Sequence, residues 1–227
     1  MLMRPVEAIA AHISVESHVS HDKFDILIDQ LDLVPKRTHY EKGAEIYCEE
    51  SSTDYVYQVI SGAVRNYKLL SDGRCQITAF YLPGDIFGFD CGTSRQTTTD
   101  AIAVTTVRAV KRGDIEAAAA EDVQISRLLL SMAIEDLDHA REQIVLLGRK
   151  TAIERVAAFL LEMERRLPAS NILPLPMCRR DIGDYLGLTL ETVSRSLSQL
   201  HEQGVLDFFG ARHIVLRNRA RLCRMEN

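Results

Sequence analysis

The stretch that decides the fold is RDIGDYLGLTLETVSRSL, residues 180–197. Ile182 and Leu186 lie four residues apart, so they share one face of a short helix. Gly187 follows where that helix must stop, because glycine adopts the positive φ of a sharp turn without strain. Thr189 is a suitable N-cap for a second helix. On that helix three apolar residues face inward: Val193, Leu197 and Leu200. The pattern predicts a helix-turn-helix.

The outward face of the second helix carries Leu190, Glu191, Ser194 and Arg195. In a helix-turn-helix the first residues of the second helix reach base edges in the major groove of DNA. Arg195 can donate two hydrogen bonds to guanine, Glu191 can accept one from a cytosine amino group, and Leu190 can contact a thymine methyl group. These four residues are the predicted base contacts. The alternative is that Glu191 and Arg195 form only an exposed ion pair on the helix.

Basic and hydroxyl side chains surround this motif. Such groups bind DNA phosphates and position a domain without specifying sequence. The predicted phosphate contacts are Arg179, Arg180, Thr189, Thr192, Arg212 and Arg217. Two β-like runs follow, residues 205–209 and 213–216, with a turn at Gly210. A hairpin in this place predicts the wing of a winged helix.

The N-terminal half has a different texture of short β-like runs separated by turns. The runs cover residues 56–60, 64–70, 76–82 and 105–110. Asp72-Gly73 stands between two of them and is a strong hairpin signal. Many short strands at this spacing predict a small antiparallel roll. Before them we expect a polar arm over residues 1–24 and a short helix over residues 24–33.

Residues 115–166 contain no proline, and Gly148 is their only glycine. This predicts a long helix, a break near Gly148 and a second helix. In the first helix apolar residues recur at steps of three and four, namely Leu129, Ala133, Leu137, Ala140, Ile144 and Leu147. Such a stripe packs against another helix, which predicts the subunit interface of a homodimer. Burial against the protein's own roll is the alternative.

The expected fold is therefore α+β, in three parts. An N-terminal arm and antiparallel β-roll cover residues 1–113, a long dimerisation helix covers 114–148, and a winged helix-turn-helix DNA-binding domain covers 149–227. Charge follows this division. Residues 150–227 carry 12 Lys and Arg against 9 Asp and Glu, whereas the preceding residues carry 15 against 23. The basic excess of the C-terminal part favours a nucleic-acid partner.

Several other classes of protein are disfavoured by the composition. The five cysteines are odd in number and none form a CxxC pair, which indicates neither a disulfide framework nor a zinc site. There is no run of about eighteen apolar residues, and residues 1–13 are too interrupted for a signal peptide, so we expect a cytoplasmic protein. Enzyme motifs such as a Gly-rich phosphate loop, HExxH or GxSxG are missing, so no catalytic residues are expected. We expect no metal site from His12, His18 and His21, which fall on the arm or its edge.

At residues 191–195, Glu-Thr-Val-Ser-Arg, the chain resembles the Crp/Fnr family of bacterial transcription regulators. The resemblance covers nearly the whole chain: a glycine-punctuated roll, a long connecting helix and a winged helix. Within the family it looks most like the FixK group of rhizobial and related bacteria. The resemblance implies a homodimer that binds a palindrome of TTGAT-like half-sites, with Glu191, Ser194 and Arg195 as base readers. It also implies action with RNA polymerase to activate genes for low-oxygen respiration and nitrogen fixation.

The chain departs from two groups of its relatives, and no cofactor is expected. Oxygen-sensing Fnr proteins hold an iron–sulfur cluster on N-terminal cysteines, but residues 1–47 contain no cysteine. Cyclic-nucleotide sensors use a Gly-Glu pair and an Arg-Ser/Thr pair in the roll. Here Phe89 stands where the ribose-binding glutamate is expected, and no Arg-Ser/Thr pair follows. A regulator gated by an unidentified small ligand in the roll is the alternative.

Cys178 stands just before the first helix of the motif and is followed by Arg179 and Arg180. Adjacent cations and a helix N-terminus both favour the reactive thiolate over the thiol. Oxidation there would add polarity or negative charge beside DNA phosphates. We therefore predict that oxidation of Cys178 weakens DNA binding. The alternative is an inert, half-buried cysteine.

Overall fold

The computed structural model describes residues 19–30, 35–90, 92–167, 172–210 and 212–226. Two four-stranded antiparallel sheets form the N-terminal roll. The first has the order β1-β8-β3-β6, with β1 Lys36–Tyr40, β8 Thr105–Lys111, β3 Tyr55–Ser61 and β6 Ile86–Phe87. The second has the order β2-β7-β4-β5, with β2 Glu45–Tyr47, β7 Thr98–Ala101, β4 Val64–Leu69 and β5 Cys75–Tyr81. The expected antiparallel roll is confirmed.

The predicted hairpin joins β4 to β5. Gly73 has φ +84°, a conformation open to glycine but strained for other residues. The register pairs Leu69 with Cys75 and Val64 with Tyr81, with one irregularity between them. The pairing confirms that Asp72-Gly73 marks the turn.

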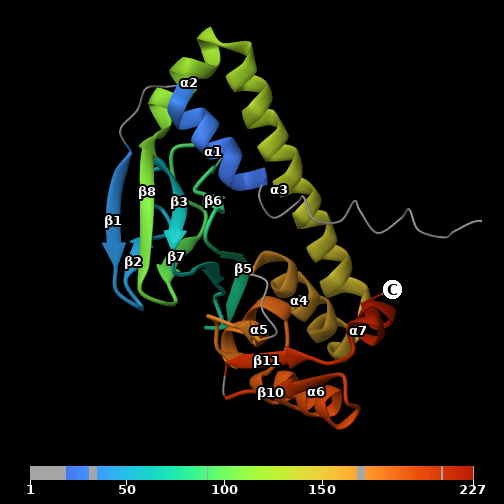
Figure 1. Ribbon diagram of the computed structural model, residues 1–227. Coiled ribbons are helices and arrows are strands. Elements are labelled where there is room, and N and C mark those ends of the chain that lie inside the picture. The colour runs from blue at the N-terminus through green and yellow to red at the C-terminus, as the bar shows by residue number, and fades with distance from the viewer. Residues whose placement is uncertain (1–18, 31–34, 91, 168–171, 211, 227) are drawn as a thin grey trace, which may run out of the picture.

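The first helix, α1 Val19–Gln30, begins earlier than expected. Phe24, Leu27 and Ile28 are buried against the roll and the helices that follow it. Figure 1 shows α1 lying between the roll and the long helix, and Lys23 pairs there with Glu135. The prediction of a helix over residues 24–33 is therefore wrong at its start, because the residues directly before Phe24 form the first turns of α1. His12 and His18 lie outside the described residues, and so do residues 31–34.

The helical stretch after the roll is divided into three helices rather than two: α2 Arg112–Glu121, α3 Val123–Arg149 and α4 Ala152–Arg166. The unexpected break falls at Asp122, whose carboxylate accepts a hydrogen bond from the amide of Gln124 at 2.7 Å and so caps α3. The second break falls at Lys150 and Thr151, while Gly148 stays inside α3. Figure 1 shows α3 running from the top of the roll down to the C-terminal domain.

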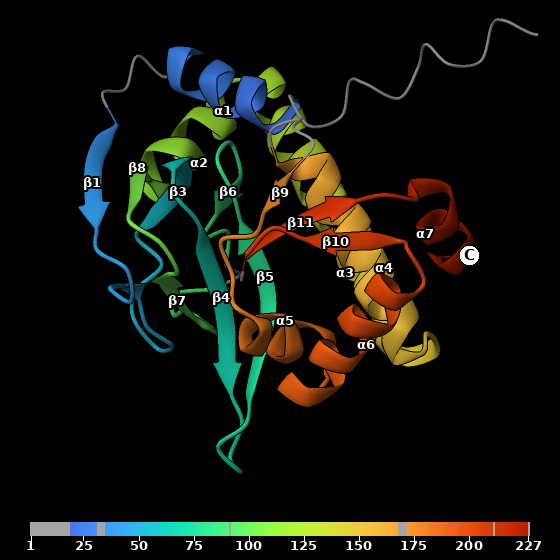
Figure 2. The same cartoon turned by 60° about the horizontal axis from the view of Figure 1, so that its bottom comes forward.

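The C-terminal domain contains α5 Arg179–Leu186, α6 Leu190–Glu202 and α7 Arg219–Glu226, with a three-stranded sheet of order β10-β11-β9. Its strands are β9 Leu173–Pro174, β10 Leu206–Phe208 and β11 His213–Leu216. One hydrophobic core runs from this domain into the roll. At their junction the ring of Phe80 lies 6.4 Å from Phe159 and 5.1 Å from Tyr185, measured between centroids. Figure 2 shows the β4–β5 hairpin beside α5. Across the described residues, no helix is both long and apolar enough to cross a bilayer.

Candidate nucleic-acid interface

The helix-turn-helix forms where the sequence predicts it. The first helix, α5, ends at Gly187, whose φ of +63° lies in the left-handed region. The amide of Leu188 then donates to the carbonyl of Gly183 at 2.9 Å, which turns the chain sharply. Thr189 caps α6 by accepting from the amide of Thr192 at 3.2 Å. The inward residues are buried as expected: Ile182, Leu186, Val193, Leu197 and Leu200.

The first two turns of α6 carry the predicted base readers. Leu190, Glu191 and Arg195 are exposed, and Ser194 is half-buried. No salt bridge joins Glu191 to Arg195 within the described part of the chain, so the ion-pair interpretation has no direct contact to support it. The Arg195 guanidinium and the Glu191 carboxylate are therefore exposed and can form hydrogen bonds with a partner.

The pKa of Glu191 is lowered, chiefly by the hydrogen bond from its own backbone amide and then by the Thr189 hydroxyl. The charges of Arg195 and Arg180 act in the same direction. These groups gather at the N-terminus of α6, where unpaired amides and the helix dipole favour negative charge. Glu191 is thus held as a carboxylate, the form that accepts hydrogen bonds and donates none.

The predicted phosphate contacts have different surroundings. Arg180 is exposed. Arg179 stacks over the ring of Phe208, with 5.4 Å between guanidinium carbon and centroid, and donates to the Ser194 hydroxyl at 3.3 Å. Arg212 donates to the carbonyl of Pro176 at 3.1 Å, and Arg217 pairs with Asp207 at 2.7 Å. Thr189 and Thr192 are joined by their hydroxyls across 3.1 Å. Each arginine has five N–H donors, so the bonded ones still offer donors to DNA.

The expected wing is present and attached to the recognition helix. Strands β10 and β11 pair from Leu206–Leu216 to Phe208–Ile214. Arg179 connects β10 to α6 through the contacts just described, and His201 of α6 lies 3.2 Å from Asp207 of β10. Phe209, directly after β10, is 65% exposed. The wing, the start of α5 and α6 are therefore connected into one partly basic surface.

Comparisons with known proteins match both halves of the chain. A family model for the Crp-like helix-turn-helix domain matches residues 154–225, and one for the cyclic nucleotide-binding domain matches residues 37–122. The nitrogen fixation regulation protein FixK of Azorhizobium caulinodans is 40% identical over 193 residues, which span 83% of this chain and 78% of that protein. The chain belongs to the Crp/Fnr family of transcription regulators.

Two further relatives place it within the family. The transcriptional activator FnrL of Cereibacter sphaeroides is 34% identical over 194 residues, covering 81% of this chain and 77% of that protein. The solved structure of FixK2 from Bradyrhizobium japonicum is 59% identical, with a TM-score of 0.84 over 86% of this chain and 98% of that one. The resemblance to FixK-type regulators is confirmed. The chain is a DNA-binding transcription regulator of this type.

The roll of this Crp/Fnr regulator is filled by its own side chains, which local sequence patterns did not predict. Arg95 is only 1% exposed. Its Nη1 donates to Asp90 and to the Gly88 carbonyl, both at 2.7 Å, and its Nη2 to the Tyr55 carbonyl at 2.5 Å. The guanidinium carbon lies 4.2 Å from the ring centroid of Tyr47. An acidic ligand in the roll would have to compete with Asp90 for this cation.

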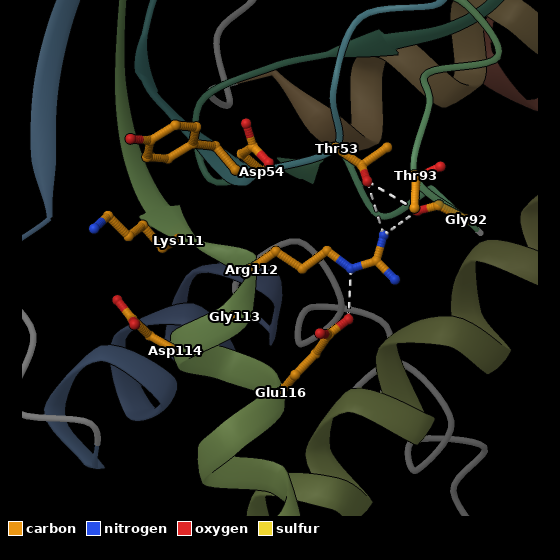
Figure 3. Close-up of a pocket in the computed structure, with 10 residues that line it drawn as sticks. Thr53, Asp54, Gly92, Thr93, Lys111, Arg112, Gly113, Asp114 and Glu116 are labelled. Carbon is orange, nitrogen blue, oxygen red and sulfur yellow. Dashed lines mark hydrogen bonds and ion pairs between the residues drawn. The ribbon is translucent and has the colours of Figure 1, made fainter.

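A separate cleft of about 540 Å³ lies between the start of β3 and the start of α2, and Figure 3 shows the residues that line it. Arg112 projects into it. Its Nη1 donates to the Thr53 hydroxyl at 3.2 Å and to the Gly92 carbonyl at 2.9 Å, and its Nε to Glu116 at 2.6 Å. These bonds hold the Arg112 guanidinium against polar groups of the protein itself. In Figure 1 this region lies at the opposite end of the molecule from α6.

Cys178 occupies the N-cap position of α5 and is half-buried. Its amide donates to a carboxylate oxygen of Asp181 at 2.8 Å. The prediction that this cysteine precedes the first helix of the motif is confirmed. Its sensitivity to oxidation stays a prediction.

Proposed function

We propose that this regulator binds, as a homodimer, a palindromic promoter site with TTGAT-like half-sites. With RNA polymerase in the cytoplasm, it then activates genes for low-oxygen respiration and nitrogen fixation. Two kinds of observation support the proposal. The relatives are named as nitrogen fixation regulators and as a transcriptional activator. The side chains of the first two turns of α6 are exposed in the manner that direct base readout requires.

The observation that carries the proposal is the division of α6 into two faces. Val193, Leu197 and Leu200 are no more than 2% exposed and fix the helix in its domain. Glu191 and Arg195, in contrast, reach solvent from its N-terminal half. Arg195 would donate to guanine O6 and N7, and Glu191 would accept from a cytosine amino group. A bidentate pair of this kind contributes about 1–3 kcal/mol of discrimination against the wrong base.

Selection of DNA sequences by the purified wild-type protein, followed by binding measurements on the Arg195→Ala variant, tests this proposal. Selection is expected to return a palindrome, and the alanine variant should lose roughly tenfold or more of its preference for that palindrome over scrambled DNA. Arg224→Ala is the matched control, because Arg224 is an exposed arginine on α7, a helix that packs against α4. An Arg195→Ala protein with unchanged preference would refute the proposed readout.

The homodimer is proposed from the exposed apolar face of α3. Leu130, Ile134, Leu137 and Ile144 are 60%, 49%, 50% and 71% exposed. They follow one another at helical steps of four, three and seven, which makes a single stripe. Two residues of the predicted set, Leu129 and Leu147, are half-buried in their own chain. The other four are exposed: Ala133, Leu137, Ala140 and Ile144. The proposed interface therefore centres on the exposed stripe.

We also propose that oxidation of Cys178 weakens DNA binding. The thiolate sulfur attacks one oxygen of hydrogen peroxide, the O–O bond breaks, and a sulfenic acid forms as hydroxide leaves and takes up a proton. Gel-shift titration with and without peroxide tests this step. The wild-type protein should lose affinity on treatment and Cys178→Ser should keep it. Equal loss in both proteins would show that another group is responsible.

A further inference from the structure

Arg65 of β4 joins the roll to the DNA-binding domain. Its Nε and Nη2 donate to the two carboxylate oxygens of Asp100 in β7, at 2.7 and 2.8 Å. Its Nη1 donates to Asp181 of α5 at 2.7 Å. Asp100 and Asp181 are each only 8% exposed, so both ion pairs lie largely out of water. The Arg65 guanidinium thus makes a bidentate contact with the roll and uses a third N–H donor to bind the helix-turn-helix.

The carboxylate of Asp181 is shared between the two domains. One oxygen accepts from Arg65, and the other accepts from the amide of Cys178 at 2.8 Å. That amide is an N-terminal group of α5 that no helical carbonyl can reach. The Asp181 carboxylate therefore connects the start of α5 directly to the roll.

A second contact lies further along α5. The Phe80 ring packs against Tyr185, and Gln76 donates to the Tyr185 carbonyl at 3.3 Å. From α4, Arg166 donates to the Phe80 carbonyl at 2.6 Å and to Asp85 at 2.5 Å. Ring packing and a neutral hydrogen bond at this end of α5 tolerate small rotations. The bidentate pair with Asp100 fixes the Arg65 guanidinium on the roll, so its charge-assisted bond to Asp181 has a set direction. The Arg65 contact is accordingly the one that specifies the angle of α5.

We propose that Arg65, through Asp181, is a positioning residue for DNA binding. It fixes the orientation of the helix-turn-helix relative to the roll and α3, and with it the distance between the two recognition helices of the dimer. Arg65 itself touches no base. This inference rests on the proposed homodimer, because only two linked helices have a spacing to fix.

A series of palindromes that differ only in the number of base pairs between half-sites tests the proposal. The wild-type protein should prefer one spacing. Arg65→Ala should lose about tenfold of its affinity for that spacing, as expected for a charge-assisted hydrogen bond, and much less for spacings one pair longer or shorter. The preference among spacings should therefore flatten. A contact that merely stabilised the fold would lower all affinities by one factor.

Two further variants make the result decisive. Arg65→Ala leaves Asp100 without its partner in the roll, so Asp181→Asn provides a route that keeps the Arg65–Asp100 pair intact. Because removal of a negative charge beside DNA acts on all spacings alike, the flattened preference is still the expected result for Asp181→Asn. Arg74→Ala is the matched control, since Arg74 lies in the same hairpin and pairs with Asp72, at 2.7 Å, rather than with the helix-turn-helix. It should leave the preference unchanged.

The outcomes separate this inference from the proposed function. If the wild-type protein shows no preferred spacing, the proposed dimeric readout fails and the positioning role fails with it. If the wild-type protein prefers one spacing, and both Arg65→Ala and Asp181→Asn keep that preference in full, only the positioning role is refuted.

Discussion

The carbonyl oxygen of Leu188 lies 2.7 Å from the point where a Cβ on Gly183 would stand. That distance is shorter than a Cβ tolerates, and the obstructing atom belongs to the backbone of the turn. The same turn is held by the hydrogen bond from the Leu188 amide to the Gly183 carbonyl. The close approach of α5 to the segment before α6 therefore depends on a residue without a side chain at position 183.

Gly183→Ala is expected to destabilise the protein and to weaken DNA binding. Helix propensity alone would favour alanine by about 1 kcal/mol, but the overpacking costs about 1–3 kcal/mol and displaces the turn. The net loss should lower the melting temperature by a few degrees, since about 1 kcal/mol corresponds to roughly 2–4 °C at this size. Gly113→Ala in α2 is the control, because a Cβ there meets nothing within 4 Å. A more stable Gly183→Ala protein would contradict the expected clash.

Arg180→Ala should weaken binding to selected and scrambled DNA by a similar factor. Arg180 is exposed at the start of α5, where it is predicted to contact a phosphate rather than a base. The slope of log affinity against log salt should become shallower by about 0.9 for each phosphate that the variant no longer neutralises. Fluorescence anisotropy over a salt series measures both quantities. A change in the ratio between selected and scrambled DNA would show instead that Arg180 reads sequence.

The turns of this protein were predictable because each depends on one or two neighbouring residues. Gly73 and Gly187 both have positive φ, and each stands where the sequence predicts a sharp turn. The burial of the inward face of α6 was predictable for the same reason. Helical spacing alone places Val193 and Leu197 on one side.

Other features depend on partners that are distant in the sequence. Strand β1 is Lys-Arg-Thr-His-Tyr and shows no apolar alternation, so it was missed. It forms because β8 pairs with it. The contact between Arg65 and Asp181 joins residues 116 positions apart, which no local pattern indicates. The break at Asp122 did have a local signal, a capping aspartate, but neither glycine nor proline marked it.

Ile134→Glu and Leu137→Glu should each convert a dimer into a monomer. Both residues lie in the exposed apolar stripe of α3, where a carboxylate would be buried against its own copy in the partner. Affinity for the palindrome should fall by roughly a hundredfold or more, because two linked binding domains act at a high effective concentration. Light scattering after gel filtration reports the mass. Gln124→Glu, which adds the same charge at an exposed site of α3, should remain dimeric.

Asp184→Asn is expected to stabilise the protein near neutral pH. Burial raises the pKa of Asp184, and the neighbouring charge of Asp181 adds to the effect. Because the folded state binds this proton more tightly than the unfolded state, stability falls as pH rises from the ordinary value through the raised one, and the penalty persists above it. The melting temperature of the variant should therefore exceed that of the wild-type protein at pH 7 and the gap should close at acid pH. Asp72→Asn is the opposite case, since hydrogen bonds from Arg74 lower the pKa of Asp72. The Asp72→Asn protein should therefore be less stable than the wild-type protein at pH values above the ordinary pKa of aspartate. A gap for Asp184→Asn that stays constant with pH would exclude titration of Asp184 as the cause.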